Sequence, residues 1–416
     1  MPLRRDHPSR QLDGNVDPGN VAPGDIAPRK RNFKMQQADF GDSRSNWKQR
    51  EEALLASYAM HSCDAQGREH PEPEHPYRGP FQRDRDRILH ASAFRRLSGK
   101  MQVFTGDMGD YHRTRLTHTH EVASLARTIG RSLRLNEDLI EAMALLHDIG
   151  HPPFGHCGED VLKECLRDSG GFSHNRFALD LVTRIEQRYT DYPGLNLTFE
   201  VLSGQRFRSH KQDSESQMLE IQVVDAADSI AYDSHDLDDA LKLGLLEWGQ
   251  LDGLDLVQRA KRTVRLGDVQ PSLRRALLVH TLLDLQMGDF LQHSSRLLGG
   301  LGQLRSQDVC KAGVSLGMSS RIEQEKRQLE GFLFEHVYRH PRLVEVRQGA
   351  AMRLRQLYRL LVGHPERLPT RVRGWVSDWG IERATGAYLA GMTDRFCDEQ
   401  YLLLVEMGRP CGVDWS

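Results

Sequence analysis

HDIGHPPFGHCGED, residues 147–160, ends one predicted helix and gathers three histidines and three carboxylates into a short turn. Residues 136–150, NEDLIEAMALLHDIG, have apolar residues at helical spacing behind Asn136, a residue type that caps helix N-termini, and the predicted helix ends at Gly150. Glycine and proline between the polar residues specify a tight, rigid turn that aims several side chains inward. Packing among apolar helices does not explain so many polar groups, so the segment predicts a functional site on a helical framework.

Helical spacing continues on both sides of this turn. Apolar residues recur at intervals of three and four in residues 85–97, 116–133 and 214–244, and the pattern persists with short breaks from residue 246 onward. No series of alternating strand patterns appears, so the sequence predicts an all-α fold. We expect three parts: a disordered tail over 1–45, a catalytic core over 46–245, and a C-terminal helical region over 246–416 that completes the substrate pocket and the oligomer contacts.

Composition excludes several classes of protein. Lys and Arg number 56 and Asp and Glu number 58, so the overall charge gives no support for nucleic-acid binding, although a local basic groove is compatible with it. No apolar run approaches the roughly 18 residues that a membrane span needs. The 6 cysteines are scattered without a CxxC pair, which indicates reduced thiols and favours a cytoplasmic protein.

The residue types around His147 and Asp148 suit a divalent metal. Histidine supplies neutral nitrogen ligands and aspartate supplies hard oxygen, and a metal held by such a set polarises phosphate oxygens and activates water. Upstream, Arg115 and His118 lie three residues apart on one helix face. Downstream, Asp228 lies in the apolar segment VVDAADSIAY, where an unpaired carboxylate is costly to bury. Asp228 is therefore expected either to pair with a cation or to ligate the metal.

Neighbouring polar residues are interpreted differently. Tyr232 and Asp236 follow Asp228 at four-residue intervals and therefore share its helix face. Asp225 is expected on another face, where it caps the helix or is solvated. His120 lies two residues from His118 and is expected to point away from the metal.

The H…HD…D order resembles the HD phosphohydrolase superfamily. The match narrows with RTRLTH (113–118), HDIGHPPFGHCGE (147–159), FSHN (172–175) and AADSIAY (226–232), which together resemble the dGTPase-like deoxynucleoside triphosphate triphosphohydrolases. FRRLSGKMQVF (94–104) and FLFEHVYRHP (332–341) also resemble that branch. The resemblance spans about residues 47–345 and implies an HD-domain core with a C-terminal helical extension.

The resemblance assigns a role to each matching position. It places the metal ligands at His118, His147, Asp148 and Asp228. It places catalytic residues at His156, Glu159 and His151, of which His151 contacts phosphate. It places the substrate-binding residues at Arg115, Gln102, His174, Tyr232, Asp236 and Tyr338. Within that set Gln102 meets the sugar 3′-hydroxyl, and Tyr338 crowds the sugar 2′ position.

The implied activity is hydrolysis of deoxynucleoside triphosphates to a deoxynucleoside and inorganic triphosphate. The implied cofactor is Mn²⁺, Fe²⁺ or Mg²⁺. The implied partners are deoxynucleotides, as substrate and as allosteric activators, and further copies of the chain in a homo-oligomer. The preferred base is not readable from the sequence, because several segments assemble the base pocket.

Three alternatives remain open at this point. Another HD enzyme, a phosphodiesterase or a nucleoside monophosphate phosphatase, would share the metal ligands. Such an enzyme is not expected to carry the array of His151, His156 and Glu159 together with Gln102 and Tyr338. A nucleotide sensor without turnover is disfavoured because every metal and catalytic position is intact. Single-stranded nucleic-acid binding is disfavoured by the near-neutral charge and by an aromatic content of 7% without a stacking series.

Overall fold

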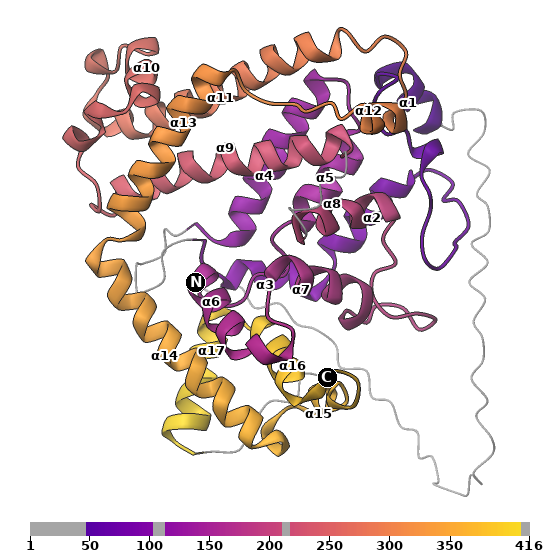
Figure 1. The fold of residues 1–416 in the computed structure, drawn as a ribbon, viewed down its shortest axis with the longest axis vertical. Coiled ribbons are helices and arrows are strands. Elements are labelled where there is room, and N and C mark those ends of the chain that lie inside the picture. The colour runs from indigo at the N-terminus through magenta and orange to yellow at the C-terminus, as the bar shows by residue number, and fades with distance from the viewer. Residues whose placement is uncertain (1–46, 103–112, 210–216, 409–416) are drawn as a thin grey trace, which may run out of the picture. The chain divides into compact units, whose positions relative to one another are not determined.

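The computed structural model describes residues 47–102, 113–209 and 217–408. In these residues the chain forms helices joined by loops, and the only β-type pairing within them consists of three isolated bridges. The predicted all-α class is therefore confirmed (Figure 1). The predicted disordered tail, 1–45, lies outside the described residues.

The helices fall into an earlier and a later series along the chain. The earlier series consists of α1 (Trp47–Leu54), α2 (Pro80–Leu89), α3 (Ser92–Arg96), α4 (Arg115–Ser132), α5 (Glu137–Leu146), α6 (Gly155–Cys165), α7 (His174–Asp180), α8 (Phe199–Ser209) and α9 (Leu219–Lys242). The later series consists of α10 (Asp255–Thr263), α11 (Pro271–Leu298), α12 (Ser306–Lys311), α13 (Ser320–Leu333), the π-helical turn η8 (Phe334–Tyr338), α14 (Pro341–Gly363), α15 (Thr370–Arg373), α16 (Val376–Ala390) and α17 (Asp394–Tyr401).

The main core forms where α4 packs against α5 and α9 (Figure 1). Helix α4 buries Val122, Ala126 and Ile129 completely, and these residues lie on one face at helical spacing. At the start of α5 the Asn136 side chain accepts a hydrogen bond of 3.2 Å from the Leu139 amide, which confirms the predicted cap. The core thus holds α5 rigidly, and α5 ends at the residue before His147.

A second apolar cluster joins the later helices to the end of α9. It contains Leu237 and Ala240 of α9 and buried residues of α10, α11, α13 and η8. Because α13 leads directly into η8, this cluster fixes the position of Tyr338 relative to α9. The predicted boundary at 245/246 stays a prediction. In the described part of the chain, no helix has the length and apolar character needed to cross a membrane.

Candidate active site

The turn that follows α5 is held from two sides. A Cβ atom on Gly150 would lie 2.1 Å from the His174 carbonyl oxygen, so only glycine lets α7 approach the turn this closely. Phe154 is buried with φ at +64°, a left-handed conformation that a non-glycine residue adopts only when its surroundings impose it. The Asp394 carboxylate, at the start of α17, accepts hydrogen bonds from the amides of Phe154 (2.9 Å) and Met101 (3.0 Å).

Lys100 adds a third support to the turn. Its ammonium group is buried and donates to the carbonyl oxygens of His151 and Ala390, the latter at 2.9 Å. Burial lowers the pKa of Lys100 well below its ordinary value, because water no longer stabilises the charge. Lys100 and Asp394 therefore tie the turn to the C-terminal helices.

The structure brings the predicted metal ligands together. The His118 Nε2 atom lies 3.2 Å from Asp228 Oδ1. The His147 Nε2 atom lies 3.6 Å from Asp148 Oδ1 and 3.6 Å from Asp228 Oδ1. The ligand atoms of His118, His147 and Asp148 also lie within 4.8 Å of one another. Residues from α4, α9 and the turn after α5 thus converge on one point.

The His147 ring shows that this cluster fits a divalent cation. Its Nδ1 atom lies 2.6 Å from the Ala144 carbonyl oxygen, and this contact places the ring proton on Nδ1 and leaves a lone pair on Nε2. The Nε2 atom is buried without a hydrogen-bond partner, although two carboxylate oxygens lie nearby. A lone pair facing carboxylates is costly unless a cation lies between them, so these residues would hold a metal.

The pKa values of the buried groups are consistent with this set of ligands. Burial lowers the pKa of His147, which favours the neutral ring that a metal requires. Burial alone would raise the pKa of Asp148, but His147, His151 and Arg115 hold it well below its ordinary value. The pKa of Asp228 is lowered in the same way by His147, His118 and Arg208.

A second polar group lies beside the metal cluster. The His151 Nε2 atom lies 3.1 Å from Asp148 Oδ1, and the His151 ring stacks on the His174 ring with 3.9 Å between centroids. Glu159 accepts hydrogen bonds from the His174 amide (3.0 Å) and lies 2.8 Å from His174 Nδ1. His151, Glu159 and His174 also have metal-compatible spacing, but these hydrogen bonds already occupy Glu159 and His174.

His156 lies in the first turn of α6 and differs from its neighbours in exposure. Its side chain is 63% exposed, and its Nδ1 atom lies 3.8 Å from Glu159 Oε2, beyond hydrogen-bond distance. The sequence predicted that Glu159 orients His156. In the structure the Glu159 carboxylate lies closer to His174 Nδ1, at 2.8 Å, than to His156. Interactions with His156 and His174 outweigh burial and lower the pKa of Glu159, so its carboxylate is ionised.

Arg115 lies beside the metal cluster, and Gln102 lies beside Arg115. Arg115 is almost fully buried, and its guanidinium group donates to Asp148 Oδ2 at 2.7 Å and to the Gln102 carbonyl oxygen at 3.4 Å. The Gln102 side-chain oxygen is buried and has no hydrogen-bond partner, so it is available to a ligand. Both predicted residues therefore lie next to the predicted metal ligands.

Tyr338 reaches α9 from the later half of the chain. Its hydroxyl group donates to Asp236 Oδ2, and its ring lies 6.2 Å from the Tyr232 ring, centroid to centroid. Together with Asp228, the two tyrosines line a cavity of about 360 Å³. The two tyrosines therefore share this cavity with one of the four predicted metal ligands, Asp228.

Sequence reasoning missed several residues around this cavity. Arg208 of α8 pairs with Asp225 (2.7 Å) and with Asp228 (3.0 Å), so the expectation that Asp225 caps the helix or is solvated is wrong. Lys326 of α13 is buried and pairs with Asp233 of α9. No spacing pattern relates these partners, because each pair joins two helices that are separate in the sequence.

Burial gives Asp236 a distinctive pH dependence. It raises the pKa of Asp236 to about 7, even though the hydrogen bond from Tyr338 opposes the shift. Between about pH 4 and pH 7 the unfolded chain releases this proton while the folded protein keeps it, so the free energy of unfolding should fall as pH rises.

In the wild type, the free energy of unfolding should therefore fall by up to about 4 kcal/mol between about pH 4 and pH 7 because of Asp236. We expect Asp236→Asn to abolish this fall. The amide oxygen of asparagine still accepts the Tyr338 hydrogen bond, so the contact itself survives. Urea unfolding of metal-free protein across this pH range measures the effect. Parallel pH profiles for the wild type and the variant would contradict it.

Two family models match this chain, one in its earlier part and one in its later part. The HD domain model matches residues 115–233, which contain the four predicted metal ligands, and the phosphohydrolase-associated domain model matches residues 316–402. A deoxyguanosinetriphosphate triphosphohydrolase-like protein of Geobacter sulfurreducens is 40% identical over 372 residues, which cover 86% of this chain and 96% of the relative. This chain belongs to the deoxyguanosinetriphosphate triphosphohydrolase-like family of HD-domain phosphohydrolases.

Other members of this triphosphohydrolase-like family show a comparable match. The protein of Bordetella pertussis with the same name is 39% identical, over 85% of this chain and 97% of its own length. That of Rhizobium meliloti is also 39% identical, over 82% of this chain and 92% of its own length. The predicted family is thus confirmed, and the likeness extends well beyond the HD domain itself.

Proposed function

We propose that this protein hydrolyses deoxynucleoside triphosphates to a deoxynucleoside and inorganic triphosphate. The observation that supports this most directly is the cavity of about 360 Å³, which Tyr232 and Tyr338 line together with Asp228. The names of the family members also favour a triphosphate substrate. A phosphate ester with a deoxyribose group would place its phosphates at the histidines and its sugar at the tyrosines.

In the proposed reaction, water attacks the α-phosphorus, the bond from that phosphorus to the 5′ oxygen breaks, and the deoxynucleoside leaves. His118, His147, Asp148 and Asp228 would hold a divalent metal, which would supply Lewis acidity and lower the pKa of a bound water. Arg115 and His151 offset negative charge on the phosphates. His156, the exposed histidine beside Glu159, is the candidate for proton transfer near the reacting phosphorus.

Mn²⁺, Fe²⁺ and Mg²⁺ all suit the proposed ligands. The resemblance further favours a homo-oligomer that responds to deoxynucleotides at separate sites, and the scattered cysteines favour the cytoplasm. Turnover assays with each of the four common deoxynucleotides, alone and in pairs, would identify the substrate and any activator, and sedimentation of the same samples would give the oligomeric state.

Product analysis tests the proposed reaction. Purified protein with Mn²⁺ or Mg²⁺ and dGTP should give deoxyguanosine and intact triphosphate in equal amounts, with no nucleoside diphosphate. Phosphorus NMR separates triphosphate, diphosphate and orthophosphate in one spectrum. Orthophosphate as the first product would instead identify a phosphatase.

Tyr338 is expected to exclude ribonucleotides. A tyrosine packed against C2′ leaves no room for a hydroxyl group, and a buried hydroxyl without a partner costs about 1–3 kcal/mol, or roughly five- to 150-fold in rate. We therefore expect the wild type to hydrolyse dGTP faster than GTP by at least a factor in this range. Tyr338→Ala should reduce the ratio of the dGTP rate to the GTP rate more than it lowers dGTP turnover.

Tyr338→Phe is the matched control, because it keeps the ring and removes only the hydroxyl group that contacts Asp236. It should keep most of the preference for deoxyribose. Values of kcat/KM for dGTP and GTP with all three proteins provide the measurement. Equal hydrolysis of GTP and dGTP by the wild type would show that Tyr338 does not exclude the 2′-hydroxyl group.

A further inference from the structure

The two metal-ligating aspartates are held in the same way. In each, one oxygen faces the histidines and the other meets an arginine. Asp148 Oδ2 accepts from Arg115 at 2.7 Å, and Asp228 Oδ2 accepts from Arg208 at 3.0 Å. The resemblance assigned a phosphate-binding role to Arg115 but none to Arg208, although the two side chains stand in equivalent relations to the metal cluster.

Arg208 retains unused hydrogen-bonding capacity. Its side chain is only 12% exposed, and its Nη2 atom lies 2.7 Å from Asp225 Oδ1. That contact is an ion pair without hydrogen-bond geometry, so Nη2 is a buried donor with no hydrogen-bond partner. A guanidinium group offers five N–H donors in a planar fork that matches the oxygens of a phosphate. Arg208 thus has a donor to offer an anion in the cavity.

The charges that line the cavity point to the same residue. Among the described residues that line the cavity of about 360 Å³, Arg208 is the one cation, whereas Asp225, Asp228, Asp233 and Glu330 are acidic. Two of these acids already have a cationic partner, because the buried Lys326 ammonium contacts Asp233 and lies 2.5 Å from Glu330. An anionic ligand that enters this cavity therefore finds its cationic partner in Arg208.

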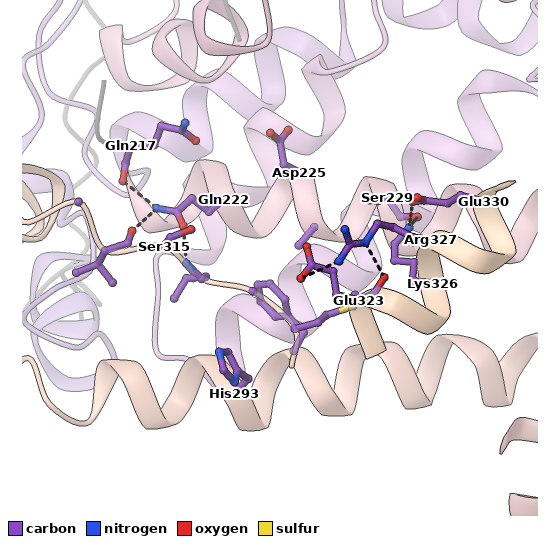
Figure 2. A pocket seen from close by; sticks show the side chains of 17 residues that line it. Gln217, Gln222, Asp225, Ser229, His293, Ser315, Glu323, Lys326, Arg327 and Glu330 are labelled. Atoms are coloured by element: carbon purple, nitrogen blue, oxygen red, sulfur yellow. Dashed lines mark hydrogen bonds and ion pairs between the residues drawn. The ribbon is translucent and has the colours of Figure 1, made fainter. Parts of the chain in front are cut away.

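The cavity borders a larger groove of about 900 Å³, and the two share Asp225, Ser229 and Glu330 as lining residues. Figure 2 shows these three residues among the side chains that line the groove. Asp225 therefore lies at the border between the two spaces, next to the guanidinium group that it pairs with. A chain of phosphates running from the metal cluster toward the groove would meet Arg208 at the position where Asp225 contacts it.

We propose that Arg208 binds the polyphosphate chain of the substrate, and that Asp225 occupies the same guanidinium group when substrate is absent. The proposal rests on the proposed function and names a binding residue for it. When phosphates arrive, Arg208 Nη2 exchanges the Asp225 carboxylate for a phosphate oxygen while Nη1 keeps its hydrogen bond to Asp228. Asp225 thereby weakens substrate binding through direct competition.

Binding of inorganic tripolyphosphate to the metal-loaded protein tests this directly. Calorimetry with excess Mg²⁺ avoids any dependence on turnover and keeps tripolyphosphate from stripping the metal. We expect Arg208→Ala to weaken tripolyphosphate binding roughly 10- to 100-fold, the size of a charge-assisted hydrogen bond, and Arg208→Lys to weaken it less. Deoxyguanosine binding should remain within about twofold in both variants, because deoxyguanosine carries no phosphate for the guanidinium group to bind.

Asp225→Asn separates this proposal from a purely structural role of Arg208. Loss of a structural ion pair would leave affinity unchanged or weaken it, whereas loss of a competitor should tighten tripolyphosphate binding several-fold, roughly threefold to tenfold. Glu323→Gln is the matched control, since Glu323 is an exposed acid that lines the groove but not the smaller cavity. It should leave binding unchanged.

The outcomes are distinct. Weaker binding in Arg208→Ala together with tighter binding in Asp225→Asn supports the proposal. Unchanged binding in Arg208→Ala with its metal retained, or weaker binding in Asp225→Asn, overturns it. If the wild type binds tripolyphosphate through Arg208 but releases orthophosphate from dGTP, the binding role of Arg208 stands and the proposed reaction fails.

Discussion

Replacing His147 with alanine should remove the bound divalent metal and lower turnover of dGTP by roughly 10³-fold or more. The reason is that His147 Nε2 lies between the Asp148 and Asp228 carboxylates, 3.6 Å from an oxygen of each. Metal ions stabilise transition-state charge by several kcal/mol, and each 1.36 kcal/mol is tenfold in rate. Metal content by atomic emission and turnover measured on the same preparation provide the check.

His61→Ala is the matched control for this experiment. His61 is also buried, but its Nε2 atom lies 3.1 Å from the Ala56 carbonyl oxygen, away from the carboxylates of the cluster. It should keep its metal even if its melting temperature falls. Full activity of His147→Ala in a preparation shown to contain no metal would refute the assignment of the metal site.

Replacing His156 with alanine should lower kcat by about 10²–10⁴-fold, the usual contribution of general acid–base catalysis. Metal content should remain unchanged, because the four proposed ligands lie elsewhere. The melting temperature should also change little, since the His156 side chain is 63% exposed and removing an exposed side chain rarely costs much stability. Turnover, metal content and melting temperature are measured on one sample.

Two variants accompany this prediction. Glu159→Gln should lose less activity than His156→Ala, because its oxygen can still accept the hydrogen bond from the His174 amide. His120→Ala is the control, since His120 is an exposed histidine on α4, the helix that carries His118. A large fall in melting temperature with near-normal turnover of the folded fraction would rule out a catalytic role for His156.

The elements that the sequence predicted well are those defined by neighbouring residues. The cap at Asn136, the helix behind it and the glycine-rich turn all depend on local spacing, although the helix ends at Leu146 and not at the predicted Gly150. The stripe of Asp228, Tyr232 and Asp236 also followed from helical periodicity, because residues four apart share a face.

Asp225 shows how the same reasoning fails. It lies three residues before Asp228, and residues three apart are also neighbours on a helix surface. A cavity of about 360 Å³ is wide enough to take in both. The decisive partner, Arg208, belongs to α8, and no spacing rule connects one helix with another.

Contacts between residues that are far apart along the chain could not be predicted from the sequence either. The hydrogen bond from the Phe154 amide to Asp394 joins residues 240 positions apart, and that from Lys100 to the Ala390 carbonyl oxygen joins residues 290 positions apart. Both hold the turn after α5 in place. Tyr338 was placed by resemblance alone, and the apolar cluster around Leu237 explains physically how it reaches Asp236.

Hydrolysis of dGTP in water enriched with heavy oxygen tests the proposed reaction most directly. If water attacks the α-phosphorus and the 5′ oxygen leaves with the nucleoside, one heavy oxygen should appear in the released triphosphate and none in deoxyguanosine. Mass spectrometry of both products resolves this in a single experiment. Heavy oxygen in deoxyguanosine, or in orthophosphate released before any triphosphate, would contradict the account.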